Sequence, residues 1–117
     1  MPSYSVACVG LATLDLVHRI AAFPSRPLKL RSLSYSASVG GMAAVAACAI
    51  ARLNGSAQYW GPIGDDPFGA TIRRELADAG VDASSVLPIQ GAASSHSVVI
   101  VDSVGGASDR ERPRQRA

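Results

Sequence analysis

The chain has 117 residues, of which 48% are hydrophobic, so it can bury a core of the size found in single domains. A formal net charge of +2 and an aromatic content of 5% argue against a basic, base-stacking surface, so we expect no nucleic acid as a ligand. The longest apolar stretch, 41–50, is too short for a membrane span, and no basic region precedes the first apolar run. The sequence therefore predicts a soluble, cytoplasmic protein with no membrane partner.

Patterning in the first forty residues indicates strands. Residues 6–11 form a continuous apolar run, which is typical of a strand buried on both faces of a parallel sheet. The spacing of apolar residues over 14–23 is less regular and ends at Pro24, so no element is predicted there. Between 28 and 38 apolar and polar residues roughly alternate, which predicts one or two half-exposed strands.

An alanine-rich segment over 41–53 predicts a helix that ends at Asn54-Gly55. It is apolar on every side as far as Arg52, so we expect it to be covered all round. Cys48 in this helix and Cys8 in the first strand have no metal-ligand spacing and no C-x-x-C pattern. We expect both to be buried free thiols, as in a reducing compartment.

The second half of the chain begins with a predicted strand over 56–60 and a loop over 61–65. Asp66 followed by Pro67 predicts the start of a helix, because a carboxylate cap precedes a proline at the first helical position. This helix is expected to end near Ala79, with Gly80 in the left-handed conformation and Val81 folding back on the last turn.

Two further strands are predicted, a short one at 86–87 and a β-branched one over 97–102, followed by a hairpin turn over 102–106. This order of elements predicts an α/β layer fold with a small extra sheet. Residues 107–117 are highly charged and have no period, so we expect a disordered basic tail.

Four segments, in their order and spacing, resemble the PfkB family of carbohydrate kinases. They are the opening strand V-A-C-V-G-L-A-T-L-D, which ends at Asp15; the pair Gly40-Gly41 before the alanine-rich helix; the loop G-P-I-G-D-D-P-F-G; and the helix end L-A-D-A-G-V-D followed by the strand S-S-H-S-V-V-I-V-D. The resemblance covers roughly residues 5–106. Within the family it is most similar to ketohexose-type members such as sulfofructose kinase.

The resemblance implies an α/β, ribokinase-like fold, here the N-terminal part of a mostly parallel sheet with flanking helices and a small β lid over the sugar. It implies the transfer of a phosphoryl group from ATP, with Mg²⁺, to a sugar hydroxyl. Asp15, Gly40 and Gly41 match sugar-contacting positions of the family, and Lys29 matches a lysine found before the double glycine in some members. Val45 stands where many members have an asparagine that hydrogen-bonds the sugar, which puts the usual sugar pose, and so the substrate, in question.

The chemistry of these residues agrees with such a role. A carboxylate such as Asp15 can accept hydrogen bonds from two neighbouring hydroxyls, and the bare backbone at Gly40 and Gly41 lets a ligand approach a helix start with free N–H groups. The structural alternatives are that Asp15 caps a turn and that the glycines form a tight turn. Lys29 either neutralises an anionic group on the sugar or is simply solvated.

Other polar residues of these segments have mainly structural interpretations. His96 begins a strand and could point into a pocket under the lid, but a surface or packing role is the stronger interpretation. Asp65, Asp66 and Gly69 are expected to serve as a loop residue, a helix cap and a point of close packing.

The residues that would transfer a phosphate are missing from the sequence. In the family, the charge stabilisation and the base come from a Gly-Ala-Gly-Asp segment at a helix N-terminus, and the ATP site comes from the same later half. These 117 residues contain neither that segment nor a Walker lysine pattern. We therefore assign no catalytic, cofactor-binding or metal-binding residue. We expect residues 1–106 to be an incomplete N-terminal sugar-binding part, with a truncation or change of reading frame near Gly106.

Three hypotheses follow from this pattern. The chain is a sugar kinase by descent that is inactive alone, a sugar-binding or dimerising module, or a non-functional fragment with an unpaired sheet edge. The module would act as a homodimer through the lid, or with a partner chain that supplies the ATP half. For the chain as given, the sequence favours an inert fragment over the partner-dependent module.

Overall fold

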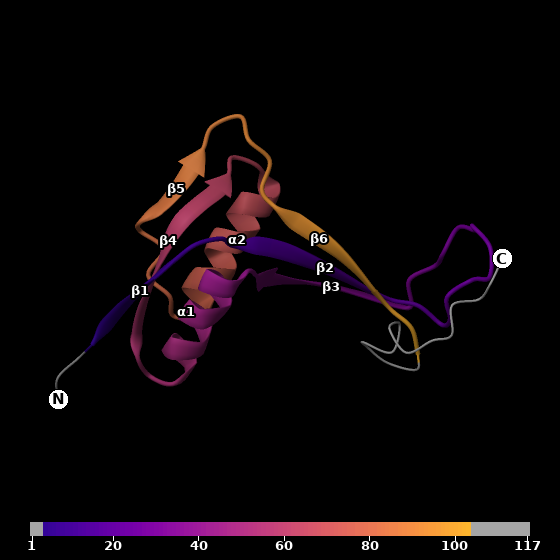
Figure 1. Ribbon diagram of the computed structural model, residues 1–117, viewed down its shortest axis with the longest axis horizontal. Helices are drawn as coiled ribbons and strands as arrows, with labels where there is room; N and C mark the ends of the chain where they lie inside the picture. Colours follow the sequence, from indigo (N-terminus) through magenta and orange to yellow (C-terminus); the bar gives the residue numbers. More distant parts are fainter. Residues whose placement is uncertain (1–3, 104–117) are drawn as a thin grey trace. The chain divides into compact units, whose positions relative to one another are not determined.

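The computed structural model describes residues 4–103 (Figure 1). Its elements, in chain order, are β1 (Ser5–Val9), β2 (Thr13–Arg19), β3 (Ser34–Gly40), α1 (Met42–Arg52), β4 (Ser56–Gly64), α2 (Pro67–Asp78), β5 (Val86–Ile89) and β6 (His96–Val101). They fall into two compact units. Of the described residues, the first unit takes 4–15 and 38–97, and the second takes 16–37 and 98–103.

The first unit is a parallel three-stranded sheet of order β1-β4-β5 with two helices packed against it (Figure 1). β4 is the central strand: its first half pairs with β1, from Ser5↔Ser56 to Val9↔Trp60. Its second half pairs with β5, from Gly61↔Val86 to Gly64↔Ile89. The strand therefore continues through the glycine and proline residues where a loop was predicted, because parallel pairing with β5 fixes that segment in an extended conformation.

The core of this unit lies between β4 and the two helices. Alternate residues of β4 are buried, and Tyr59 has no exposed surface at all. They pack against an alanine face of α1 and against Ile72 and Leu76 of α2, both of which are fully buried. Burial of one alternating face and one helix stripe is what amphipathic elements require to form a core.

Helix α2 confirms the predicted helix and both of its ends. Asp66 is the N-cap, and its carboxylate accepts a hydrogen bond of 2.8 Å from the N–H of Gly69. At the other end Gly80 has a φ of 89°, and the N–H of the buried Val81 donates to the carbonyl of Leu76 at 2.9 Å. Local chemistry at the two ends therefore sets the limits of this helix.

Helix α1 lies where it was predicted, but the expectation that it is covered all round is wrong for the described residues. Ala43, Ala44 and Ala47 are buried, whereas Met42 and Val45 are 87% and 52% exposed. Only one side of the helix faces the sheet, so the other side has no covering layer within residues 4–103. Asn54, with a φ of 65°, follows the helix end as expected.

Strand β1 is also more exposed than predicted. Four of its five residues are exposed, since it lies at the edge of the sheet and helices cover a single face of that sheet. Cys8 and Cys48 are free cysteines, as expected, but each is only half-buried. A strand buried on both faces would need a second covering layer, which residues 4–103 do not supply.

The second unit contains most of a three-stranded sheet of order β3-β2-β6. This sheet corresponds to the predicted small extra sheet, although β2 lies in a segment for which no element was predicted. Residues 28–33, expected to begin a strand, form none, and β3 starts at Ser34. His18 on β2 hydrogen-bonds Ser32 at 2.7 Å and contacts the ring of Tyr35.

Two expectations fall outside the described residues, namely the end of the hairpin turn at 104–106 and the disordered tail at 107–117. Within residues 4–103, no helix has the length and apolar character needed to cross a bilayer.

Candidate functional site

Asp15 and the two adjacent glycines lie around one cavity in the first unit. The cavity has a volume of about 530 Å³ and is lined by Asp15, Val39, Gly40, Gly41, Met42, Val45, Ala46 and Ala49. Its walls therefore come from the second strand, the end of the third strand and one side of α1. Three of the four residues predicted to contact a sugar are brought together here, from segments some 25 residues apart in the sequence.

The carboxylate of Asp15 is held on one side by two hydroxyl groups. Thr13 donates to Asp15 Oδ1 at 3.2 Å, and Ser97, which is 82 residues further along the chain, donates to the same oxygen at 2.8 Å. Both hydrogen bonds found for this carboxylate within residues 4–103 go to Oδ1, and Oδ2 lies on the side of Gly40. The arrangement leaves Oδ2 as the oxygen that can accept hydrogen bonds from a ligand.

Gly40 and Gly41 are required at this site for different reasons. A Cβ atom at Gly40 would lie 2.8 Å from both Asp15 Cγ and Thr13 Oγ1, inside the contact distance of real side chains. Gly41 has a φ of 90°, and a Cβ atom there would lie 2.5 Å from the carbonyl oxygen of Leu11. The first glycine therefore leaves room for the carboxylate, and the second allows the turn that starts α1.

The start of α1 lies at the cavity. Gly41 is the N-cap residue and has no side chain to hydrogen-bond the N–H groups of the first turn. Gly41 and Met42 both line the cavity beside Asp15. The Asp15 carboxylate, the bare backbone of two glycines and the first residue of α1 therefore line one hollow, and its carboxylate can accept hydrogen bonds from a polyhydroxylated ligand.

A second polar cluster, centred on Asp66, links the end of β4 to the segment before β6. Asp66 accepts hydrogen bonds from the N–H and the hydroxyl of Ser94 at 2.8 and 2.7 Å, in addition to the N–H of Gly69. The bonds from Ser94 and Gly69 lower the pKa of Asp66 from its ordinary value. The Ser94 hydroxyl also accepts from the N–H of Gly64 at 2.9 Å, so four hydrogen bonds join Asp66 and Ser94 to each other and to two glycines.

This cluster is structural, as expected for Asp66 and Gly69. Gly69 is buried against the carbonyl of Gly64, and no side chain would fit between them. Asp65 is exposed, and its N–H donates to Ala92 at 3.0 Å as part of the same loop. Sequence reasoning missed Ser94, since a serine in a loop carries no signal that its partner lies 28 residues away.

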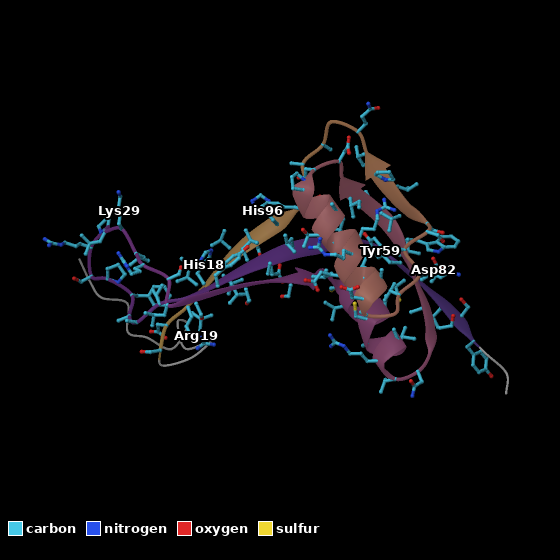
Figure 2. All side chains as sticks on the ribbon, turned by 180° about the vertical axis from the view of Figure 1, so that it is seen from behind. His18, Arg19, Lys29, Tyr59, Asp82 and His96 are labelled. Atoms are coloured by element: carbon cyan, nitrogen blue, oxygen red, sulfur yellow. The ribbon has the colours of Figure 1, made fainter. Side chains whose placement is uncertain are left out.

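The remaining candidates lie elsewhere. The ring of His96 contacts Phe68, with ring centres 5.0 Å apart, and one ring nitrogen lies 3.3 Å from the carbonyl of Ser94 (Figure 2). This agrees with the packing interpretation. Lys29 is exposed in the segment between β2 and β3, in the second unit (Figure 2). It is not among the residues that line the cavity around Asp15.

Comparison with known proteins identifies the family. A family model described as pfkB family carbohydrate kinase matches residues 3–109. The chain belongs to this family. It is 32% identical over 100 residues to the ATP-dependent ribose-1-phosphate kinase of Halopiger xanaduensis, across 86% of this chain and 34% of that protein.

Solved structures of pfkB-type kinases share the fold described above. A ribokinase-like protein of Agrobacterium tumefaciens matches with a TM-score of 0.81 and 37% identity, over 90% of this chain and 34% of that one. Arabidopsis thaliana ribokinase, solved with ribose and ATP, matches with a TM-score of 0.74 and 27% identity, over 91% and 34%. The α/β ribokinase-like fold is thus confirmed, and this pfkB chain spans about a third of the length of these relatives.

The side chains of residues 4–103 offer no cluster of metal ligands. Among residues 4–103, no three His, Cys, Asp or Glu side chains gather into a group that could hold a metal ion. Asp15 is the one carboxylate among the residues that line the cavity, and the other lining residues are two glycines and five apolar side chains. A single carboxylate of this kind can accept hydrogen bonds from hydroxyl groups.

Proposed function

We propose that this chain forms the sugar-binding part of an ATP-dependent sugar kinase, with Asp15 as the residue that accepts hydrogen bonds from the sugar hydroxyls. The observation that carries the proposal is the orientation of this carboxylate. Oδ1 is occupied by Thr13 and Ser97, while Oδ2 lies beside Gly40 in a cavity large enough for a monosaccharide.

In this proposal each group at the cavity has one task. Asp15 accepts from one or two hydroxyls, and the N–H groups at the start of α1 donate to a sugar oxygen. Thr13 and Ser97 keep the carboxylate from rotating, so its geometry is set before the ligand arrives. The relatives named above, a ribose-1-phosphate kinase and a ribokinase solved with ribose, support a sugar as the ligand.

Phosphoryl transfer is assigned to parts of the fold that lie outside residues 4–103. ATP, when bound, supplies the phosphoryl group, and Mg²⁺ supplies charge stabilisation. Within residues 4–103 no three His, Cys, Asp or Glu side chains gather to hold the metal ion. The isolated chain is therefore expected to bind a sugar without phosphorylating it.

The test is a titration of the purified chain with D-ribose and D-fructose, followed by NMR chemical shifts of the cavity residues. Asp15→Asn keeps the shape of the side chain but removes its charge, and a hydrogen bond to a charged group contributes about 1.5 to 3 kcal/mol. We expect binding to weaken by about ten- to a hundredfold. Equal binding by the variant, or ATP-dependent turnover by the isolated wild-type chain, would contradict the proposal.

A second candidate is supported by the face of the β1-β4-β5 sheet that the helices leave open. A cavity of about 570 Å³ on it is lined by Val9, Gly10, Leu11, Trp60, Gly61, Pro62, Ser85 and Leu87. Val9 and Leu87, on either side of β4, are 72% and 60% exposed, which is unusual for apolar residues that line one cavity of a soluble surface. This favours a module that works with a polypeptide carrying the remaining two thirds of the kinase fold.

Co-expression with the C-terminal two thirds of the Agrobacterium relative tests this second candidate. Co-purification and ATP-dependent sugar phosphorylation are expected, and Trp60→Glu on the open face should abolish both. Failure to co-purify would leave the chain as a sugar-binding part alone. Homodimerisation through the β3-β2-β6 sheet, acting as the lid, is a separate proposal, and sedimentation velocity would show it as a dimer at micromolar concentration.

A further inference from the structure

The open side of α1 is apolar from Met42 to Ala49. Met42, Val45, Ala46 and Ala49 are all exposed, and their spacing of three, four and seven residues places them in one stripe. The solvent-facing side of a surface helix is ordinarily polar or charged. No polar side chain interrupts this stripe before Arg52. An exposed apolar surface of this kind is typical of a site that contacts a ligand or a partner.

This stripe forms the wall of the cavity that contains Asp15. All four of its residues line that cavity together with the carboxylate and the two glycines. Val45 and Ala49 also line a neighbouring cavity of about 270 Å³, whose other walls include the polar side chains of Ser38, Arg52 and Glu75, so the apolar surface ends there. A ligand whose hydroxyls reach Asp15 therefore has another part of its surface against Val45 and its neighbours.

An apolar wall discriminates between substituents by their desolvation. A hydroxyl pressed against Val45 would lose its water partners and gain none, because a valine side chain neither donates nor accepts hydrogen bonds. A carbon–hydrogen or alkyl group in the same place keeps its apolar contact and loses nothing.

We infer that this site selects deoxygenated or alkyl-bearing carbohydrates. One carbon of such a ligand carries the hydroxyl from which Asp15 accepts a hydrogen bond, and another carbon, which lacks a hydroxyl or carries an alkyl group, lies against Val45. The inference rests on the proposed function, since it takes the cavity to be the sugar site. It makes Val45 a specificity-determining residue of that site and a deoxy sugar its preferred class of substrate.

The test compares parent and deoxy sugars on the purified chain. The probes are D-ribose with 2-deoxy-D-ribose, and D-fructose with its 1-deoxy and 6-deoxy analogues, with Kd measured by NMR titration. We expect at least one deoxy analogue to bind about three- to tenfold more tightly than its parent, within the roughly hundredfold range that an apolar pocket can achieve. The ratio of the Kd values for the parent and deoxy sugars is measured on one protein, so it does not depend on the fraction of that protein that is folded.

Two variants make the comparison specific. Val45→Thr keeps the size of the side chain and adds a hydroxyl, so the deoxy preference should vanish or reverse. Val9→Thr is the matched control, because Val9 is exposed in the same unit but lines the cavity on the open face of the β1-β4-β5 sheet. The ratio of parent to deoxy Kd values for this variant should equal that of wild type.

The outcomes separate the inference from the proposed function. If sugars bind in an Asp15-dependent way but every parent binds at least as tightly as its deoxy analogues, the specificity inference is overturned and the proposed function stands. The specificity inference is likewise overturned if Val45→Thr leaves the ratio unchanged. If no sugar binds, or if Asp15→Asn binds as well as wild type, the proposed function fails and the inference falls with it.

Discussion

The contact between Gly40 and Asp15 can be measured by adding a single methyl group. Gly40→Ala places a Cβ atom 2.8 Å from both Asp15 Cγ and Thr13 Oγ1, so the carboxylate has to move. Overpacking of this kind costs about 1 to 3 kcal/mol. Gly40 is not among the residues with positive φ, so an alanine there adds no backbone strain and recovers about 0.4 to 1 kcal/mol through the unfolded chain. We expect a net loss of about 1 to 2 kcal/mol in the free energy of unfolding.

A double-mutant cycle with Asp15→Ala assigns this loss to the carboxylate. Once the carboxylate is removed, two of the three closest atoms to the new methyl group are gone, so Gly40→Ala should cost less by about 1 kcal/mol or more. Urea unfolding of the wild type, both single variants and the double variant, followed by circular dichroism, gives the coupling energy.

Gly91→Ala is the control for the cycle. Gly91 has a φ of 75°, and nothing lies within 4 Å of the position that a Cβ atom would take there, so its cost comes from the backbone alone and should be independent of Asp15. If Gly40→Ala and Asp15→Ala add within about 0.5 kcal/mol, the glycine is not making room for the carboxylate and the described geometry of the site is wrong.

Two further variants probe the core and the Asp66 cluster. Tyr59→Phe removes a hydrogen bond of 3.0 Å to the carbonyl of Gly10 and should lower the free energy of unfolding by about 1 kcal/mol. Urea unfolding should show a lower midpoint with an unchanged slope, and an unchanged midpoint would contradict this prediction. The pKa of Asp66 is lowered in the folded state, so the stability it contributes is complete above its unfolded pKa of about 3.9 and is lost as the pH falls through the lower folded value. Asp66→Asn should therefore reduce the loss of stability as the pH falls below the unfolded pKa, and a loss as steep as that of wild type would refute the assignment.

Features that depend on local chemistry were predictable from the sequence. Helix α2 is an example, because its cap at Asp66, the proline after it and Gly80 are all signals carried by neighbouring residues. The grouping of Asp15 with Gly40 and Gly41 was also anticipated, but through the family resemblance rather than through periodicity.

Features that depend on distant partners were not predictable. The end of β4, read as a loop at Gly61 to Gly64, is a strand only because β5 pairs with it more than 20 residues later. Ser97, which fixes the Asp15 carboxylate from 82 residues away, has no local signal at all. The burial of β1 was overestimated because an apolar run shows what a strand can tolerate, not which layers this chain supplies to cover it.

The central position of β4 has a consequence for how the chain acquires its structure. β1 leaves the ribosome before β4, and its pairing partner in β4 is made about fifty residues later, so the loop between them has to close before the pairing can stabilise the chain. Helix α1 is only 11 residues long and is marginal in isolation, and it too packs on β4. Nascent chains that stop short of residue 64 should therefore stay protease-sensitive, and order should arise in one late step as this strand is completed.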